Sequence, residues 1–153
     1  MSRVTIGTFS LDVGPAWTLT TVILAGPTGE SSAGSRLLTS QAPNQFQQNL
    51  VAVMEQVGSD ETPRNYFDRQ IEGLRKAGIN RQEAKEPEQV EVGGRDGLLT
   101  EQVVSSPTGE WVRQMQLISI KDGVAYTLIA THLEGEPFER ARDSFRAMLL
   151  SFV

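Results

Sequence analysis

Cysteine is absent from this chain of 153 residues, and histidine occurs only once. Without cysteine there is no disulfide, no thiolate metal site and no cysteine nucleophile. Basic residues are also scarce, because 14 lysines and arginines stand against 19 aspartates and glutamates, which leaves a net charge of -5. Nucleic acids and anionic lipid surfaces both require a concentrated basic face. The composition therefore argues against both kinds of partner.

Motifs for the common catalytic and cofactor chemistries are missing as well. A Ser-His-acid triad would have to use His132, and the serine-rich segment 29–34 has neither the spacing of a nucleophile elbow nor a helix after it. The sequence contains no P-loop and no His-Glu-x-x-His motif. The acidic segment 83–91 lacks the ligand pattern of a calcium loop and is typical of a solvated edge strand. We predict no enzymatic activity, no metal and no cofactor.

Long hydrophobic runs are absent too. The most apolar early stretch, Thr18–Ala25, is too short and too rich in threonine to span a membrane. The first residues show no apolar core of a signal peptide and lead directly into an alternating pattern. We expect a cytoplasmic protein that does not insert into a membrane.

The sequence does contain a series of short strand patterns interrupted by two helices. The strand patterns, rich in β-branched residues or bounded by turn residues, lie at 9–13, 17–25, 36–39, 48–57 and 98–105. Thr62 can cap a helix that Gly78 ends, and an apolar stripe predicts a second helix after Glu136. The pattern predicts one α+β domain over residues 1–153, an antiparallel sheet of about six to seven strands with two helices packed on it.

The segment Val112–Leu133 carries almost no charge. It is typical of a β-hairpin with Asp122-Gly123 at the turn, and it has no charged residue over 114–120 or 124–133. An antiparallel sheet with one wet face normally shows charge on that face. Here neither face does. We therefore expect one face to pack on the protein's own helices and the other to be covered by something else.

Four glutamines on the predicted strands are of interest: Gln56, Gln102, Gln114 and Gln116. An uncharged amide both donates and accepts hydrogen bonds. Such amides could bind a partner's backbone or polar side chains in a semi-apolar groove. They could equally lie on the solvent side of the sheet, and the sequence leaves both interpretations open.

Five short apolar segments occur in order along nearly the whole chain: Phe9–Val13, Thr21–Leu24 after Trp17, Tyr66–Leu74, Val112–Gln116 and Phe145–Phe152. Their order resembles that of the DcrB-related proteins with a PsbP-like sandwich, and more narrowly the Eag (effector-associated gene) chaperones of type VI secretion systems. The resemblance implies a small dimeric adaptor that does no chemistry. Such chaperones hold the apolar N-terminal transmembrane helices of an effector before it is loaded on the secretion spike.

The client-binding surface that this resemblance implies can be placed on four residues. Val22 and Leu24 share one face of the second main strand pattern, and Gln114 and Gln116 share one face of the hairpin. The expected partners are a secretion effector, through its N-terminal transmembrane region, and a second copy of the chain. We expect the homodimer because a sheet with two uncharged faces has one more face than two helices can cover.

Two other functions remain alternatives. The chain could be a PsbP-like accessory or regulatory module that binds a protein without transmembrane segments, or it could be a small-ligand carrier or enzyme. A chaperone is needed to keep an apolar effector fragment soluble, whereas an accessory module is not. A carrier or enzyme would need a closed pocket.

Overall fold

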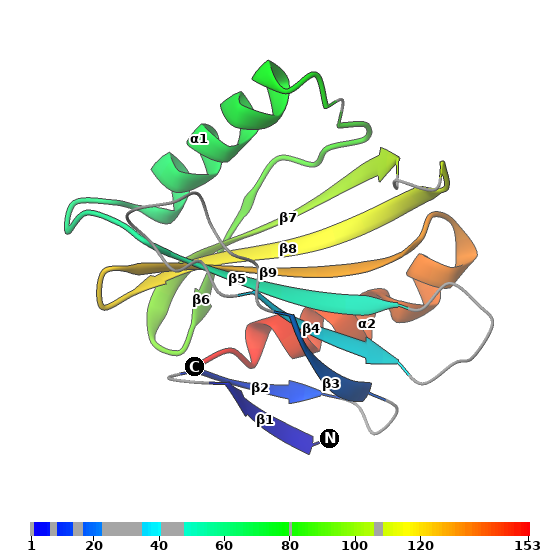
Figure 1. The fold of residues 1–153 in the computed structure, drawn as a ribbon, viewed down its shortest axis with the longest axis horizontal. Helices are drawn as coiled ribbons and strands as arrows, with labels where there is room; N and C mark the ends of the chain where they lie inside the picture. The colour runs from blue at the N-terminus through cyan, green and yellow to red at the C-terminus, as the bar shows by residue number, and fades with distance from the viewer. Residues whose placement is uncertain are drawn as a thin grey trace.

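The computed structural model describes residues 2–6, 9–13, 17–22, 35–40, 48–79, 81–105 and 109–153. The elements in these ranges are β1 Ser2–Ile6, β2 Phe9–Val13, β3 Trp17–Val22, β4 Ser35–Ser40, β5 Asn49–Gln56, α1 Pro63–Lys76, β6 Glu88–Val92, β7 Arg95–Ser105, β8 Trp111–Lys121, β9 Val124–Leu133 and α2 Glu136–Leu150. Seven strands form one antiparallel sheet in the order β3-β4-β5-β9-β8-β7-β6, and β1 pairs with β2 in a separate hairpin (Figure 1). The predicted α+β class, with two helices and an antiparallel sheet, is confirmed.

The two helices pack on opposite faces of this sheet (Figure 1). Phe145 of α2 belongs to the larger core together with Leu117 of β8, and Phe67 of α1 belongs to a smaller core together with Ile118. Neighbouring residues of a strand point to opposite faces, so Leu117 belongs to the larger core and Ile118 to the smaller one. The expectation that both helices cover one face is therefore wrong. Each face of the β8-β9 hairpin packs against one helix, because both faces carry apolar residues.

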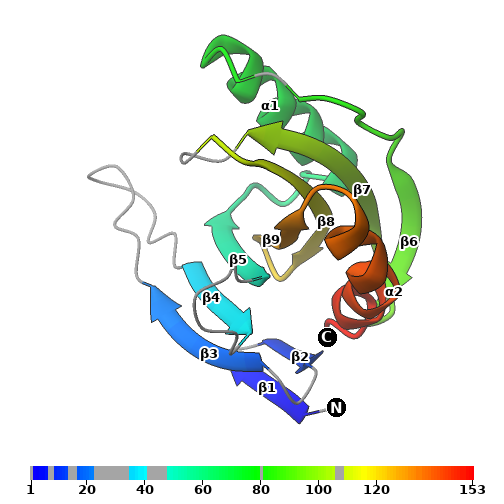
Figure 2. The same cartoon turned by 90° about the vertical axis from the view of Figure 1, so that its right-hand side faces the viewer.

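The larger core lies between α2, the sheet and the β1-β2 hairpin. Its largest side chains, Phe138, Phe145 and Phe152, are fully buried. Leu11 of β2 is also fully buried there. β2 lies beside the last residue of the sequence, because the backbone groups of Ser10 and Val153 exchange two hydrogen bonds of 3.2 Å. Figure 2 shows α2 and the hairpin together on one side of the curved sheet and α1 on the other.

Local sequence signals fix where α1 begins and ends. The Thr62 hydroxyl accepts a hydrogen bond from the backbone N–H of Asn65 at 3.1 Å, which satisfies one of the free donors of the first turn. Past the helix end, Gly78 has a φ of 74°, a conformation that suits glycine. The predicted start and stop signals are both confirmed.

Candidate functional site

The face of the sheet that carries α1 has no charged residue over a wide area. Three adjacent rows of paired residues each cross six strands, from β3 to β7. The first row is Val22, Ser35, Val53, Thr127, Ile118 and Leu98; the second is Thr20, Leu37, Val51, Ile129, Gln116 and Thr100; the third is Thr18, Thr39, Asn49, Thr131, Gln114 and Gln102. We call these three rows the uncharged face. Sheet faces that meet water normally carry charge, so this face is unusual.

Amide side chains form two short hydrogen-bonded series on the uncharged face. The Gln116 amide donates to the Gln70 carbonyl at 3.1 Å, and the Gln70 amide donates to the Thr127 hydroxyl at 3.3 Å. Since Gln70 lies on α1, this series ties the helix to β8 and β9. In the second series, the Gln102 amide donates to the Gln114 carbonyl at 3.0 Å. Arg81, which follows α1, donates to the Gln102 carbonyl.

Gln114 and Gln116, the two site residues predicted on the β8-β9 hairpin, have different surroundings in the structure. Gln114 is half-buried, whereas Gln116 is 7% exposed and bonded to α1. The Gln116 side chain is thus largely covered, whereas Gln114 stays partly accessible. Gln102 is 6% exposed, and Gln56 is exposed at the end of β5. The spacing of the glutamines alone could not show these differences, because α1 and the segment after it decide which amide is covered.

The two predicted residues before the hairpin lie elsewhere on the sheet. Val22 ends β3 and stands in the same row as Ile118, but β4, β5 and β9 lie between β3 and β8. At about 4.8 Å per strand, the backbones of β3 and β8 are roughly 19 Å apart. Leu24 falls outside the described residues. Val22 therefore lies in the same sheet as the two glutamines but not next to them.

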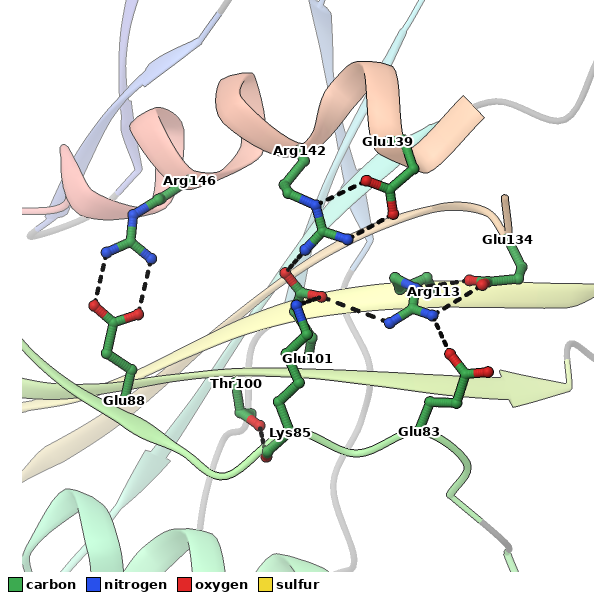
Figure 3. Close-up of polar contacts among 10 residues, drawn as sticks. All are labelled: Glu83, Lys85, Glu88, Thr100, Glu101, Arg113, Glu134, Glu139, Arg142 and Arg146. Atoms are coloured by element: carbon green, nitrogen blue, oxygen red, sulfur yellow. Dashed lines mark hydrogen bonds and ion pairs between the residues drawn. The ribbon is translucent and has the colours of Figure 1, made fainter. Parts of the chain in front are cut away.

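The opposite face of the sheet holds a charged cluster that the sequence reading missed (Figure 3). The Arg113 side chain is 8% exposed, and its guanidinium contacts the carboxylates of Glu134 at 2.8 Å and Glu101 at 3.6 Å. Glu83 is a third partner, from the segment after α1. The Glu101 carboxylate is also paired with Lys85 at 3.0 Å. Glu83 and Lys85 precede β6, whereas Glu101, Arg113 and Glu134 lie in β7, in β8 and after β9. Spacing gave no signal because these segments are far apart in the sequence.

The cluster continues along α2. Arg142 bridges Glu101 of β7 and Glu139 of its own helix, and Arg146 contacts Glu88 of β6 at 2.8 Å. The hydrogen bond from Arg146 holds the pKa of Glu88 below its usual range. Glu88 was expected to be a solvated edge residue, but its ion pair with Arg146 connects the edge strand β6 to α2. Because the cations and carboxylates satisfy one another, we interpret this cluster as a structural tie between β6, β7, β8 and α2.

Other chemistry-bearing residues give no catalytic constellation in the described part of the chain. His132 accepts a hydrogen bond on Nδ1 from the backbone N–H of Leu133 at 2.8 Å, and burial lowers the pKa of its ring. Among the described residues no three His, Cys, Asp or Glu side chains are grouped so that they could hold a metal ion. In the same residues no helix has both the length and the apolar character needed to cross a membrane.

Solved structures with a similar arrangement identify the fold. CyanoP, the PsbP protein of the cyanobacterium Synechocystis, aligns with a TM-score of 0.67 at 13% identity, over 99% of this chain and 91% of that one. LpqN of Mycobacterium tuberculosis, involved in cell envelope biogenesis, aligns with a TM-score of 0.63 at 18% identity, over 99% of this chain and 88% of that one. The fold is PsbP-like. A protein of unknown function from Pseudomonas aeruginosa also shares it, with a TM-score of 0.60 at 12% identity over 85% of this chain and 91% of that one.

Sequence comparisons add no narrower family to this fold. No known family model matches the chain, and no curated protein matches it. Identities of 12–18% to the solved structures establish a shared architecture and no shared activity. The predicted PsbP-like sandwich is therefore confirmed, while membership of the DcrB-related or Eag families stays a prediction.

Proposed function

We propose that this protein is a cytoplasmic chaperone of the Eag type, which shields the apolar N-terminal transmembrane segments of a type VI secretion effector. The observation that carries the proposal is the uncharged face, three rows of six residues without one aspartate, glutamate, lysine or arginine. A transmembrane helix is costly to keep in water because its surface is apolar all round. A surface without charge can cover such a helix without burying an unpaired ion.

The dimensions of the uncharged face suit this client. Six strands at about 4.8 Å spacing span roughly 24 Å between the first and the last. α1 packs over β7 and β8 at one end of this width, and the remaining strands β3, β4, β5 and β9 span roughly 14 Å. An α-helix with its side chains is about 10–12 Å across, so one client helix can lie on this remaining part. Val51 and Ile129, in the middle of the second row, are half-buried and offer aliphatic surface. The half-buried Gln114 amide offers a hydrogen bond to a serine, threonine or exposed carbonyl of the client.

A second function has support from the fold itself. PsbP-like architecture occurs in CyanoP and in LpqN, the latter involved in cell envelope biogenesis. The same surface could serve an accessory or regulatory module whose protein partner has no transmembrane segment. Such a partner would be soluble alone, which separates the two functions experimentally.

Co-expression with apolar effector fragments tests the proposal. N-terminal fragments of effectors from the same genome, each with a pair of apolar helices, are expressed with the wild-type chain or with Gln114→Glu. This variant places a charge in the third row without changing side-chain size. The matched control is Gln56→Glu, an exposed strand position outside the three rows. We expect wild type and control to keep a fragment soluble and Gln114→Glu to lower the soluble yield about tenfold.

Two outcomes would contradict the chaperone function. The fragments could stay soluble without the chain, or Gln114→Glu could protect them as well as wild type does. Capture of a partner that is soluble by itself, with no protection of any apolar fragment, would favour the accessory module instead.

A further inference from the structure

Arg81 differs from most arginines whose side chains the structure describes. Eight of these arginines form ion pairs with a carboxylate: Arg3, Arg64, Arg69, Arg75, Arg113, Arg140, Arg142 and Arg146. Arg81 forms none with the described residues, and its Nε–H donates to the neutral amide of Gln102. Its Nη2 is buried and has no hydrogen-bond partner. Arg95 also lacks a carboxylate, but it donates to the Gly93 carbonyl beside the end of the chain.

Arg81 lines a cavity of about 310 Å³ between α1 and the segment that leads to β6. Part of the lining is apolar and consists of Phe67, Ile71, Ala84 and Pro87. The Phe67 ring lies under the guanidinium, with its centroid 5.5 Å from Cζ. The cavity therefore combines apolar side chains with charged groups, which is the usual make-up of a small-molecule site.

The other charges around the cavity already have partners. Arg64 is paired with Asp68 at 3.3 Å and with Glu86 at 3.6 Å. Lys85 is paired with Glu101 at 3.0 Å. Glu72 is paired with Arg75 at 2.6 Å. Arg81 is thus the one charge of the lining that has no oppositely charged partner among the described residues.

An uncompensated, partly buried guanidinium is energetically unfavourable. Burial lowers the pKa of Arg81 because no anion offsets the lost hydration, whereas the carboxylates beside Arg113 and Arg142 raise theirs. A cation taken out of water is stabilised mainly by an opposite charge. The natural counterpart of a guanidinium fork is a planar carboxylate, which matches one positive charge with one negative charge.

We propose that this cavity binds a small organic carboxylate, with the anion on Arg81 and an apolar group against Phe67 and Ile71. The cavity lining contains no residue of the uncharged face, although Arg81 donates to Gln102 in its third row, and the carboxylate site does not depend on the proposed chaperone function. The carboxylate belongs either to a free acid or to the C-terminus of a short peptide. A phosphate dianion would bring more charge than the Arg81 cation can offset.

Titration with matched probes tests the proposal. Phenylacetate, its neutral analogue phenylacetamide and the dianion phenyl phosphate are added to the full chain, and binding is followed by calorimetry and by NMR shifts of the α1 amides. A tripeptide ending in free phenylalanine and its amidated form make up the second arm. We expect phenylacetate or the free-acid tripeptide to bind at least tenfold more tightly than its neutral counterpart, and phenyl phosphate to bind more weakly than phenylacetate. Whichever carboxylate binds identifies the source.

Variants then assign the site to Arg81. Arg81→Gln keeps an amide next to Gln102 but removes the cation, and should abolish the preference for the carboxylate. The control is Arg75→Gln, an exposed arginine of α1 with a carboxylate partner, and it should bind like wild type. Arg81→Lys keeps the charge but loses the planar fork, and should weaken binding about tenfold; it also serves if Arg81→Gln does not fold.

Clear results would overturn the site. If neither carboxylate binds more tightly than its neutral analogue, the proposed anion site is wrong. Retention of the carboxylate preference in Arg81→Gln would place the binding elsewhere, provided that circular dichroism shows the variant to be folded. Equal weakening in Arg75→Gln would mean that general surface charge, and not the cavity, attracts the probe.

Discussion

Gln114 and Gln116 lie two residues apart on β8, yet they are expected to respond differently to mutation. Gln116 is buried and bonded to Gln70 of α1, so Gln116→Ala leaves the half-buried Gln70 carbonyl without its donor. We expect this to lower the free energy of unfolding by about 1–3 kcal/mol, and Gln114→Ala to lower it by less than about 1 kcal/mol. Urea unfolding followed by circular dichroism measures both. Equal losses would contradict the different surroundings described for the two amides.

Client capture should show the opposite order. Gln114 offers its amide on the uncharged face, so Gln114→Ala should weaken binding of an apolar fragment by about 1 kcal/mol, the net value of one hydrogen bond. Gln116→Ala should affect binding only through the stability of α1. A competition assay at a temperature where both variants are folded separates the effects. If neither substitution changes the affinity for the apolar fragment, the glutamines are not part of the proposed client site.

Tyr66 gives a pH-dependent contribution to stability. Burial, and next the hydrogen bond to Glu55 at 2.7 Å, raise its pKa from 10.0 to about 12. The folded protein therefore keeps the phenol proton at pH values where the unfolded chain has lost it. This contribution is complete below pH 10 and is lost as the pH rises from about 10 to 12, up to about 3 kcal/mol. Tyr66→Phe should lose less stability over that range, as measured by unfolding at several pH values; parallel curves would contradict the assignment.

The sequence predicted those single-residue features that depend on local chain geometry. Thr62 could be identified as a cap and Gly78 as a stop because both act within one helical turn. The bonds of Gln116 to Gln70 and of Arg81 to Gln102 span 46 and 21 positions. No local pattern encodes contacts of that length, so the amide series and the unpaired guanidinium emerged only with the structure.

At the scale of elements, α2 is the main contributor to the core. Phe145 is fully buried among the sheet residues, and its ring lies 5.7 Å from that of Phe138. Phe145→Ala should lower the free energy of unfolding by about 3–5 kcal/mol, the usual range for a buried phenylalanine. Chemical denaturation provides the measurement. A loss below about 1 kcal/mol would show that α2 is not packed in this way.

The charged cluster ties α2 to the β6-β7 side of the sheet through buried ions. Arg113→Met removes a cation whose side chain is 8% exposed and leaves Glu101 with fewer partners, so we expect a loss of about 3–5 kcal/mol. The control is Glu83→Ala, which removes a carboxylate that is 68% exposed and should cost less than about 1 kcal/mol. Thermal unfolding of the two variants tests the difference. Similar losses would mean that the cluster is no stronger than a surface ion pair.

Helix positions and helix faces were not equally predictable. The apolar stripe of α2 and the capping residues of α1 predicted that both helices exist and approximately where they end. Which face each helix covers could not be derived, because both faces of the β8-β9 hairpin are apolar: Leu117 and Leu128 on one, Ile118 and Ala125 on the other. Period-two alternation identifies two faces but does not say which helix packs on each.

At the scale of the whole molecule, the homodimer stays a prediction whose basis has changed. α1 covers part of the face that was expected to need a second copy. The sheet edges now supply the stronger argument. The edge strand β6 carries Glu88 and Glu91, which discourage pairing, whereas the edge strand β3 has no charged residue in its six positions. An uncharged edge strand is a template for another chain.

We therefore expect two copies to associate through β3, with a mass in solution of about twice the 16.8 kDa of the chain. Thr20→Lys, in the middle of β3, should shift the population to monomer because two lysines would face each other across a paired edge. Gln89→Lys in β6 is the control and should leave the dimer intact. Light scattering coupled to gel filtration at micromolar concentration gives the masses. A monomer at every concentration would end the dimer prediction, whereas a dimer insensitive to Thr20→Lys would move the interface away from β3.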